Sequence, residues 1–90
     1  GEAAMMEYLQ QNIKFPLAAR EQGITGTVYV KFIVNKKGEV VNIELLRGIG
    51  GGCEEVAIKA IRNMPKWNPG MQNGEPVNVE FNLPVSFLLH

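Results

Sequence analysis

Residues 25–46, TGTVYVKFIVNKKGEVVNIELL, decide the fold of this chain because polarity alternates on both sides of one turn. The first half places every second residue on one apolar face, which consists of Val28, Val30, Phe32 and Val34. Turn formers follow at residues 35–38, where Gly38 can take the positive φ of a hairpin turn. The second half alternates again, and its predicted core face is Val41, Ile43 and Leu45. The stretch therefore predicts a β-hairpin with one buried face.

A third alternating segment lies near the end of the chain, beyond a predicted loop at residues 65–76. Every odd position from 77 to 89 is apolar, whereas the even positions from 78 to 86 are Asn78, Glu80, Asn82, Pro84 and Ser86. This segment predicts the longest strand of the chain. Because Pro84 has no N–H to donate to a neighbouring strand, it predicts that this strand lies at a sheet edge or that pairing stops there.

Helical spacing of apolar residues appears on both sides of the hairpin. The main helix is predicted over residues 53–64, with an apolar stripe of Cys53, Val56, Ala57, Ala60, Ile61 and Met64. Ile58 lies off this stripe, and Pro65 ends the helix. A short first helix is predicted to end near Lys14, on the spacing of Met5, Met6, Leu9 and Ile13. A second one is predicted over residues 16–22, closed by Gly23.

These elements predict an α+β fold with a three-stranded antiparallel sheet. The connection through the main helix would skip one position and place the third strand beside the first, giving the order 2-1-3 of a split βαβ unit. The main helix covers one face of the sheet, and the short amino-terminal helices add to it. Both outer strands then have free edges, which are templates for a strand from another chain. The same property predicts a weak, concentration-dependent homodimer.

Length and composition limit the classes of function. Ninety residues, 46% hydrophobic and 20% charged, predict one folded domain over residues 1–90. Nine basic and nine acidic residues give a net charge of zero, which argues against binding to duplex nucleic acid. No apolar run reaches the roughly 18 residues of a membrane helix. The chain begins with Gly1 rather than Met, so we expect it to be a fragment of a longer protein.

The residues needed for catalysis or metal binding are nearly absent. The sequence has no Asp, and it has one each of Ser86, His90 and Cys53, which excludes a Ser-His-Asp triad, an intrachain disulfide and a Cys/His metal site. The glycine loop at residues 48–52 lacks the Lys-Ser/Thr ending of a phosphate-binding loop. Glu54 and Glu55, which follow it, would repel a phosphate. We therefore predict no catalytic residue, no cofactor and no metal.

Several spaced motifs resemble the carboxy-terminal domain of the TonB energy transducers. The first are Phe15-Pro16, Ala18-Ala19-Arg20, Gly23 and Gly26-Thr27-Val28, and the second is MPKWNPG at residues 64–70 with the strand that follows it. The resemblance extends from about Met6 to Leu88. The triple-glycine loop before Cys53 and the Leu83-Pro84-Val85 run are most similar to the versions found in Bacteroidetes-type bacteria.

This resemblance implies a non-enzymatic periplasmic domain of an inner-membrane-anchored protein. Such proteins are driven by the proton-motive ExbB-ExbD complex through their amino-terminal part, and they power nutrient uptake. Their terminal domain grips the TonB box, an extended segment of an outer-membrane receptor, through the edge of its last strand. By position, that strand is Val77, Asn78, Val79, Glu80, Phe81, Asn82 and Leu83. Asn12 falls where the family often has a Gln that contacts the receptor.

Two other functions remain open at this point. The same domain occurs as an appendage of membrane-embedded metallopeptidases of the antibiotic-sensor type, where it would sense or dock a partner. A parent protein with a His-Glu-x-x-His motif would indicate that role, and one membrane helix with a Pro-rich linker would indicate the transducer. A weaker hypothesis is an acylphosphatase-like enzyme that uses Arg20 or Arg47 with an Asn.

Overall fold

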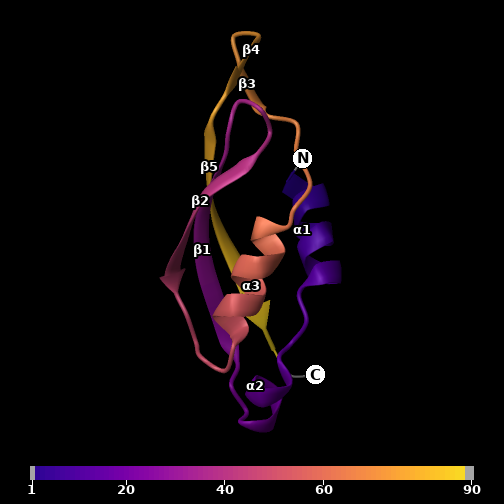
Figure 1. The fold of residues 1–90 in the computed structure, drawn as a ribbon, viewed down its shortest axis with the longest axis vertical. Coiled ribbons are helices and arrows are strands. Elements are labelled where there is room, and N and C mark those ends of the chain that lie inside the picture. Colours follow the sequence, from indigo (N-terminus) through magenta and orange to yellow (C-terminus); the bar gives the residue numbers. More distant parts are fainter. Residues whose placement is uncertain (1, 89–90) are drawn as a thin grey trace.

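Strand β1 (Gly26–Val34) is the centre of a three-stranded antiparallel sheet, with β2 (Val40–Arg47) on one side and β5 (Val79–Phe87) on the other. The structure is a computed structural model that describes residues 2–88. The predicted 2-1-3 order is confirmed, with β5 as the third long strand (Figure 1). The remaining elements are α1 (Glu2–Asn12), α2 (Leu17–Glu21), α3 (Cys53–Arg62), β3 (Gly70–Gln72) and β4 (Glu75–Val77).

The core lies between the sheet and two helices on one of its faces. In Figure 1, α3 lies in front of the strands and α1 lies beside α3, and α3 contacts β1, β2 and α1. The even-numbered residues of β1 face these helices, and Val28, Val30 and Phe32 have no exposed surface. From α1, Met5 and Leu9 are buried at 3% exposure each. The alternating apolar residues of β1 therefore form the sheet side of the core, as the sequence predicts.

Helix α3 packs through the predicted stripe. Cys53, Ala57, Ala60 and Ile61 are buried in the helix, whereas Ile58 is half-buried. The carboxylates of Glu54 and Glu55 occupy its first turn, where the helix dipole favours negative charge. Burial raises the pKa of the Cys53 thiol, and the charges of these two glutamates raise it further.

Strand β2 differs from its prediction because it contains two irregularities. Ile33 lies opposite Val41 and Lys31 lies opposite Glu44, so two residues of β2 span the space of one residue of β1. Asn42 lies in this bulge with a φ of 54°. A bulge reverses the alternation, so Val41 is on the face away from the core, contrary to the prediction. The β2 side chains that pack against the core are Val40 and Ile43, and Leu45 is 42% exposed.

The segment predicted as a loop at residues 65–76 contains a small hairpin. Strands β3 and β4 pair around Asn73 and Gly74, which have φ angles of 52° and 79°. Both values suit the two-residue turn that an Asn-Gly pair favours. Val77 therefore belongs to β4, and β5 begins only at Val79. Strand β5 has nine residues, as β1 has, so the prediction of a longest strand is wrong, while Leu89 lies outside the described residues.

The molecule is elongated, with principal extents of 49 × 21 × 16 Å. The β3–β4 hairpin forms one end of the long axis and α2 forms the other (Figure 1). The first helix ends at Asn12, slightly earlier than predicted, and Gly23 closes α2 with a φ of 68°, as predicted. Among residues 2–88, the helices are too short or too polar to span a membrane.

Candidate functional site

Strand β5 presents a long and regular edge. It pairs with β1 through nine consecutive residue pairs, from Gly26 opposite Phe87 to Val34 opposite Val79, without a register shift. Within the described part of the chain, β1 is its only partner strand. The outer side of β5 therefore carries backbone groups that no other described strand pairs.

Apolar anchors hold β5 in place. Its odd-numbered side chains face the core, and Leu83, Val85 and Phe87 are at most 8% exposed. Phe81 stacks on Phe32 of β1 with ring centroids 5.5 Å apart and planes 18° apart. The even-numbered side chains are exposed. This packing fixes the strand without using its outer edge.

The direction of the amides follows from the hairpin that joins β1 and β2. Asn35, directly after β1, donates its backbone N–H to the Glu39 carbonyl at 2.9 Å, so its amide points toward β2. Alternate residues of a strand point to opposite sides. The backbone N–H and C=O groups of the even-numbered β1 residues therefore point toward β5, where their partners are the odd-numbered residues. Glu80 and Asn82 consequently direct their N–H and C=O groups toward the free edge. Pro84 directs its carbonyl group the same way, and its lack of an N–H removes no hydrogen bond to β1.

A hollow of about 380 Å³ runs beside this edge. Its lining consists of Met6, Leu9, Gln10 and Ile13 on one side and Pro84, Val85 and Ser86 on the other. Three consecutive residues of a strand point to alternating faces, so a hollow that touches all three reaches the edge of β5, and its contacts with Met6 and Ile13 place it on the side of the sheet that α1 covers. We call this hollow the edge groove.

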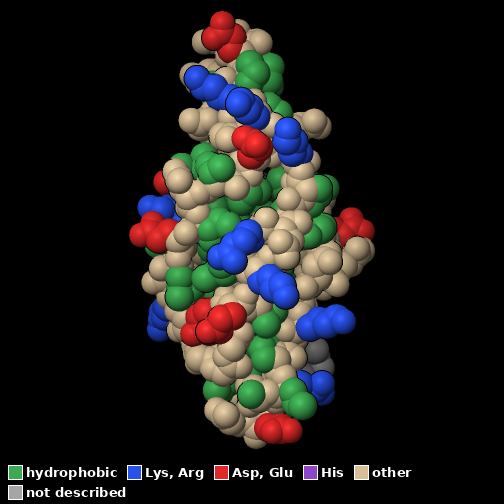
Figure 2. All heavy atoms as spheres, in the orientation of Figure 1, with side chains coloured by type: hydrophobic (Ala, Val, Ile, Leu, Met, Phe, Trp, Pro, Cys, Tyr) green, Lys and Arg blue, Asp and Glu red, His purple; other side chains and the backbone are tan. Residues whose placement is uncertain are grey.

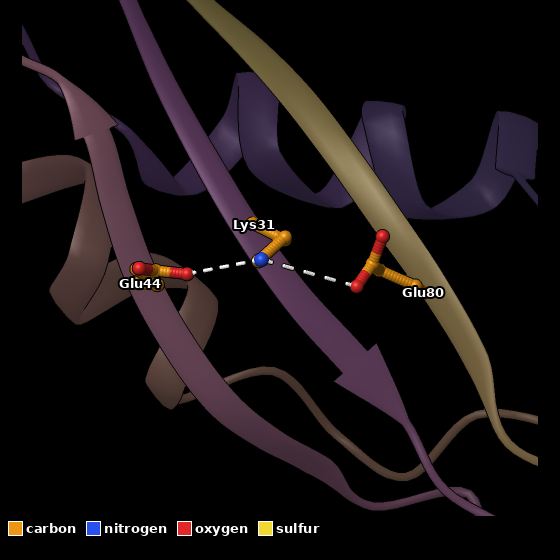
Figure 3. A network of polar contacts seen from close by, with 3 residues as sticks. All are labelled: Lys31, Glu44 and Glu80. Carbon is orange, nitrogen blue, oxygen red and sulfur yellow. Dashed lines mark ion pairs between the residues drawn. The ribbon is translucent and has the colours of Figure 1, made fainter.

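An ion-pair row crosses the face of the sheet opposite the helices. Lys31 Nζ of β1 lies 3.1 Å from Glu44 Oε2 of β2 and 4.0 Å from Glu80 Oε1 of β5 (Figure 3). The hydrogen bond to Glu44 and the charges of both glutamates raise the pKa of Lys31, and desolvation opposes them. Each strand of the sheet thus contributes one charge, in the order negative, positive, negative.

The structure does not bring all eight predicted site residues together. Asn12 ends α1, and its Nδ2 donates to the Tyr8 carbonyl at 2.8 Å. It lines a separate hollow beside α3 rather than the edge groove. Val77 pairs with Gly70 in the small hairpin. Asn78 Oδ1 accepts the backbone N–H of Lys36 at 2.9 Å and so ties β5 to the β1–β2 turn.

The remaining predicted residues, Val79, Glu80, Phe81, Asn82 and Leu83, do lie on β5. Sequence reasoning missed the groove residues on α1, although the apolar spacing of Met6 and Ile13 predicted a packed helix there. It also stopped the site before Pro84, the residue that signals an edge.

Chemical groups for catalysis do not converge on this edge. Within residues 2–88, no group of three or more His, Cys, Asp or Glu side chains could hold a metal ion. The face drawn in Figure 2 shows basic and acidic side chains interspersed over the surface. The unpaired outer edge of β5 is of the kind to which an extended segment of another chain can add.

Comparison with known proteins gives three findings. The family described as Gram-negative bacterial TonB protein C-terminal matches residues 11–89. Protein TonB of Vibrio cholerae is 30% identical over 77 residues, which cover 84% of this chain and 31% of that protein. The chain thus spans about a third of the length of this relative.

Solved structures agree on the fold. An NMR solution structure of Helicobacter pylori TonB-CTD, residues 179–285, has a TM-score of 0.72 at 22% identity, covering 94% of this chain and 77% of that one. A second NMR structure, of residues 194–285, has a TM-score of 0.70 at 21% identity, covering 96% and 90%.

Proposed function

Because the chain belongs to the family of Gram-negative bacterial TonB protein C-terminal domains, we propose that it is the peptide-binding module of a TonB-type energy transducer. In this role it grips the TonB box of an outer-membrane receptor by adding the receptor segment to the edge of β5. The domain acts by binding and pulling, without catalysis. The grip couples the inner-membrane proton-motive force to nutrient uptake.

The observation that supports this proposal is the regular outer edge of β5. Glu80 and Asn82 direct their amides outward, and the packing of Phe81 and Leu83 against the core holds the strand in a regular register with β1. An extended segment gains affinity there from main-chain hydrogen bonds and specificity from alternate side chains. The neutral charge of the domain predicts weak binding with a shallow dependence on salt.

The same proposal assigns location and partners. The domain lies in the periplasm, as part of a protein anchored in the inner membrane. ExbB-ExbD acts on portions of that protein outside this chain. Two copies of the domain pair weakly through their β5 edges at high concentration, and this homodimer competes with the receptor segment for the same backbone groups.

Removal of single amide donors tests the binding mode. Asn82→Pro removes an N–H at the free edge and leaves the ladder to β1 intact. Each lost hydrogen bond contributes about 0.5–1.5 kcal/mol, so we expect a receptor-derived extended peptide to bind about 2- to 12-fold more weakly. Isothermal titration of a folded variant, checked by circular dichroism, measures the change.

Asn82→Ala is the matched control, because it changes the same side chain and keeps the N–H. It should bind the peptide within about twofold of the original domain. An ester bond in place of the Glu80 amide provides a second donor deletion with the side chain unchanged. The proposal fails if both donor deletions leave affinity unchanged while substitutions around Trp67 or the triple-glycine loop abolish binding.

A further inference from the structure

The ion-pair row ends on a carboxylate at the free edge. Lys31 lies closer to Glu44 than to Glu80, at 3.1 Å against 4.0 Å, and the Glu80 side chain is 55% exposed. Opposite charges on neighbouring strands stabilise a sheet, and like charges destabilise it. The row alternates in sign from β2 to β5, so a strand added beside β5 meets a negative charge that its Lys neighbour only partly offsets (Figure 3).

The edge groove lies on the other face of the same edge, farther along β5. Its lining has no charged residue and is mixed in polarity, because the apolar side chains of Met6, Leu9, Ile13 and Val85 lie beside the polar side chains of Gln10 and Ser86. A side chain that an added strand projects toward α1 would enter this space and would be removed from contact with water. Glu80 and Val85 therefore offer two different environments to one added strand.

Resting on the proposed function, we infer that the segment added to β5 carries a Lys or Arg beside Glu80 and an apolar residue about five positions away, in the edge groove. The spacing follows from strand geometry. Glu80 and Val85 are five residues apart, which is about 17 Å along a strand, and an odd separation places their added neighbours on opposite faces. The partner is thus an extended peptide with basic and apolar residues on opposite faces.

Synthetic peptides test both features without knowledge of the receptor. The probes are ten-residue Thr/Val peptides with blocked ends that carry lysine at the third position and leucine at the eighth. A second probe reverses the two, because β5 can accept a strand in either direction. Each probe has a version with glutamate in place of lysine and one with serine in place of leucine.

In the preferred orientation, we expect the lysine probe to bind about three- to tenfold more tightly than its glutamate version. Glu80→Lys should reverse that order. Glu44→Gln removes a carboxylate from the same row but on the opposite edge, so it should keep the order with a smaller margin, because Lys31 is then left with Glu80 as its single partner in the row. For the groove, Ile13→Ala should weaken the leucine probe about threefold and leave the serine probe unchanged, whereas Ile58→Ala on α3 should affect neither.

The outcomes separate this inference from the function on which it rests. If Glu80→Lys fails to reverse the preference, or if no probe binds while a receptor-derived peptide does, the inference is wrong and strand addition stands. Probe binding that is insensitive to Ile13→Ala also overturns the groove assignment. If Asn82→Pro and the ester variant show that the receptor peptide binds away from β5, both proposals fall together.

Discussion

The two outer strands of the sheet pair with the same central strand, yet their edges are built differently. β5 pairs with β1 through nine residues without a shift, whereas β2 shifts register twice within eight residues. Asn42 adopts a positive φ in one of these bulges. Bulges twist an edge and interrupt its row of backbone groups, so they disfavour the addition of another strand. The contrast indicates that one edge is protected and the other is left available.

The two edges also differ in how firmly the core holds them. Val30 lies opposite Leu83 on one side and Leu45 on the other. Leu83 is 7% exposed and Leu45 is 42% exposed, although both flank the same buried residue. The core thus holds the β5 edge more firmly than the β2 edge, and in the proposed strand addition a firmly held edge lowers the entropy cost of binding.

The largest expected effect compares these two leucines. Leu83→Ala should lower the free energy of unfolding by about 2–4 kcal/mol, because it leaves a cavity in the core. Leu45→Ala should cost less than about 1 kcal/mol, because that side chain is already partly in water. Urea denaturation of both variants measures the difference. Equal losses would show that the core holds both edges alike.

A smaller effect applies one substitution to both edges. Asn42→Val places a β-branched residue at a positive φ and should destabilise the fold by about 1–2 kcal/mol. Asn82→Val falls in a regular strand and should be neutral or stabilising by up to about 0.5 kcal/mol. Thermal unfolding monitored by circular dichroism compares them, with Asn42→Gly as the control that should keep full stability. A neutral Asn42→Val would mean that β2 has no bulge at that residue.

The smallest effect concerns Lys31, which joins the two edges. Glu44→Gln should lower the pKa of its ammonium group more than Glu80→Gln does, because Glu44 contributes both the hydrogen bond and the larger charge interaction. NMR titration of the Lys31 amine measures both shifts. Because the pKa of Lys31 is raised in the fold, its ion pairs stabilise the fold fully when the pH is below the ordinary lysine pKa of 10.5. This contribution disappears as the pH rises through the folded-state pKa. A larger shift with Glu80→Gln would contradict the geometry of the row.

The sequence predicts those parts of the fold whose polarity repeats over many residues. The period of two in β1 and β5 and the stripe of α3 are each long enough to be unambiguous. The bulge in β2 was missed because Val40 and Val41 are both apolar, so alternation alone leaves the register open there. The β3–β4 hairpin was missed because each strand has three residues, although the Asn73-Gly74 pair signalled the turn.

The candidate site was predicted less completely than the fold. Residues 79–83 were identified from the strand pattern and the family resemblance, but the groove depends on how α1 packs against β5, about 70 positions away in sequence. Local periodicity does not encode that packing. The hydrogen bond from the Lys36 amide to Asn78 is also long-range, and it gives Asn78 a structural role that its place in the strand pattern did not suggest.

The burial of Cys53 has a consequence for the proposed periplasmic location. Oxidation and thiol exchange both begin with the thiolate, and both need a reagent to reach the sulfur. Cys53 has no exposed surface, and its raised pKa keeps the thiol protonated at neutral pH. An oxidant can therefore attack only molecules in which an opening of the structure has exposed the sulfur. The stability of the core thus sets the lifetime of the thiol, and a domain with one cysteine can persist in an oxidising compartment without cross-linking to its neighbours.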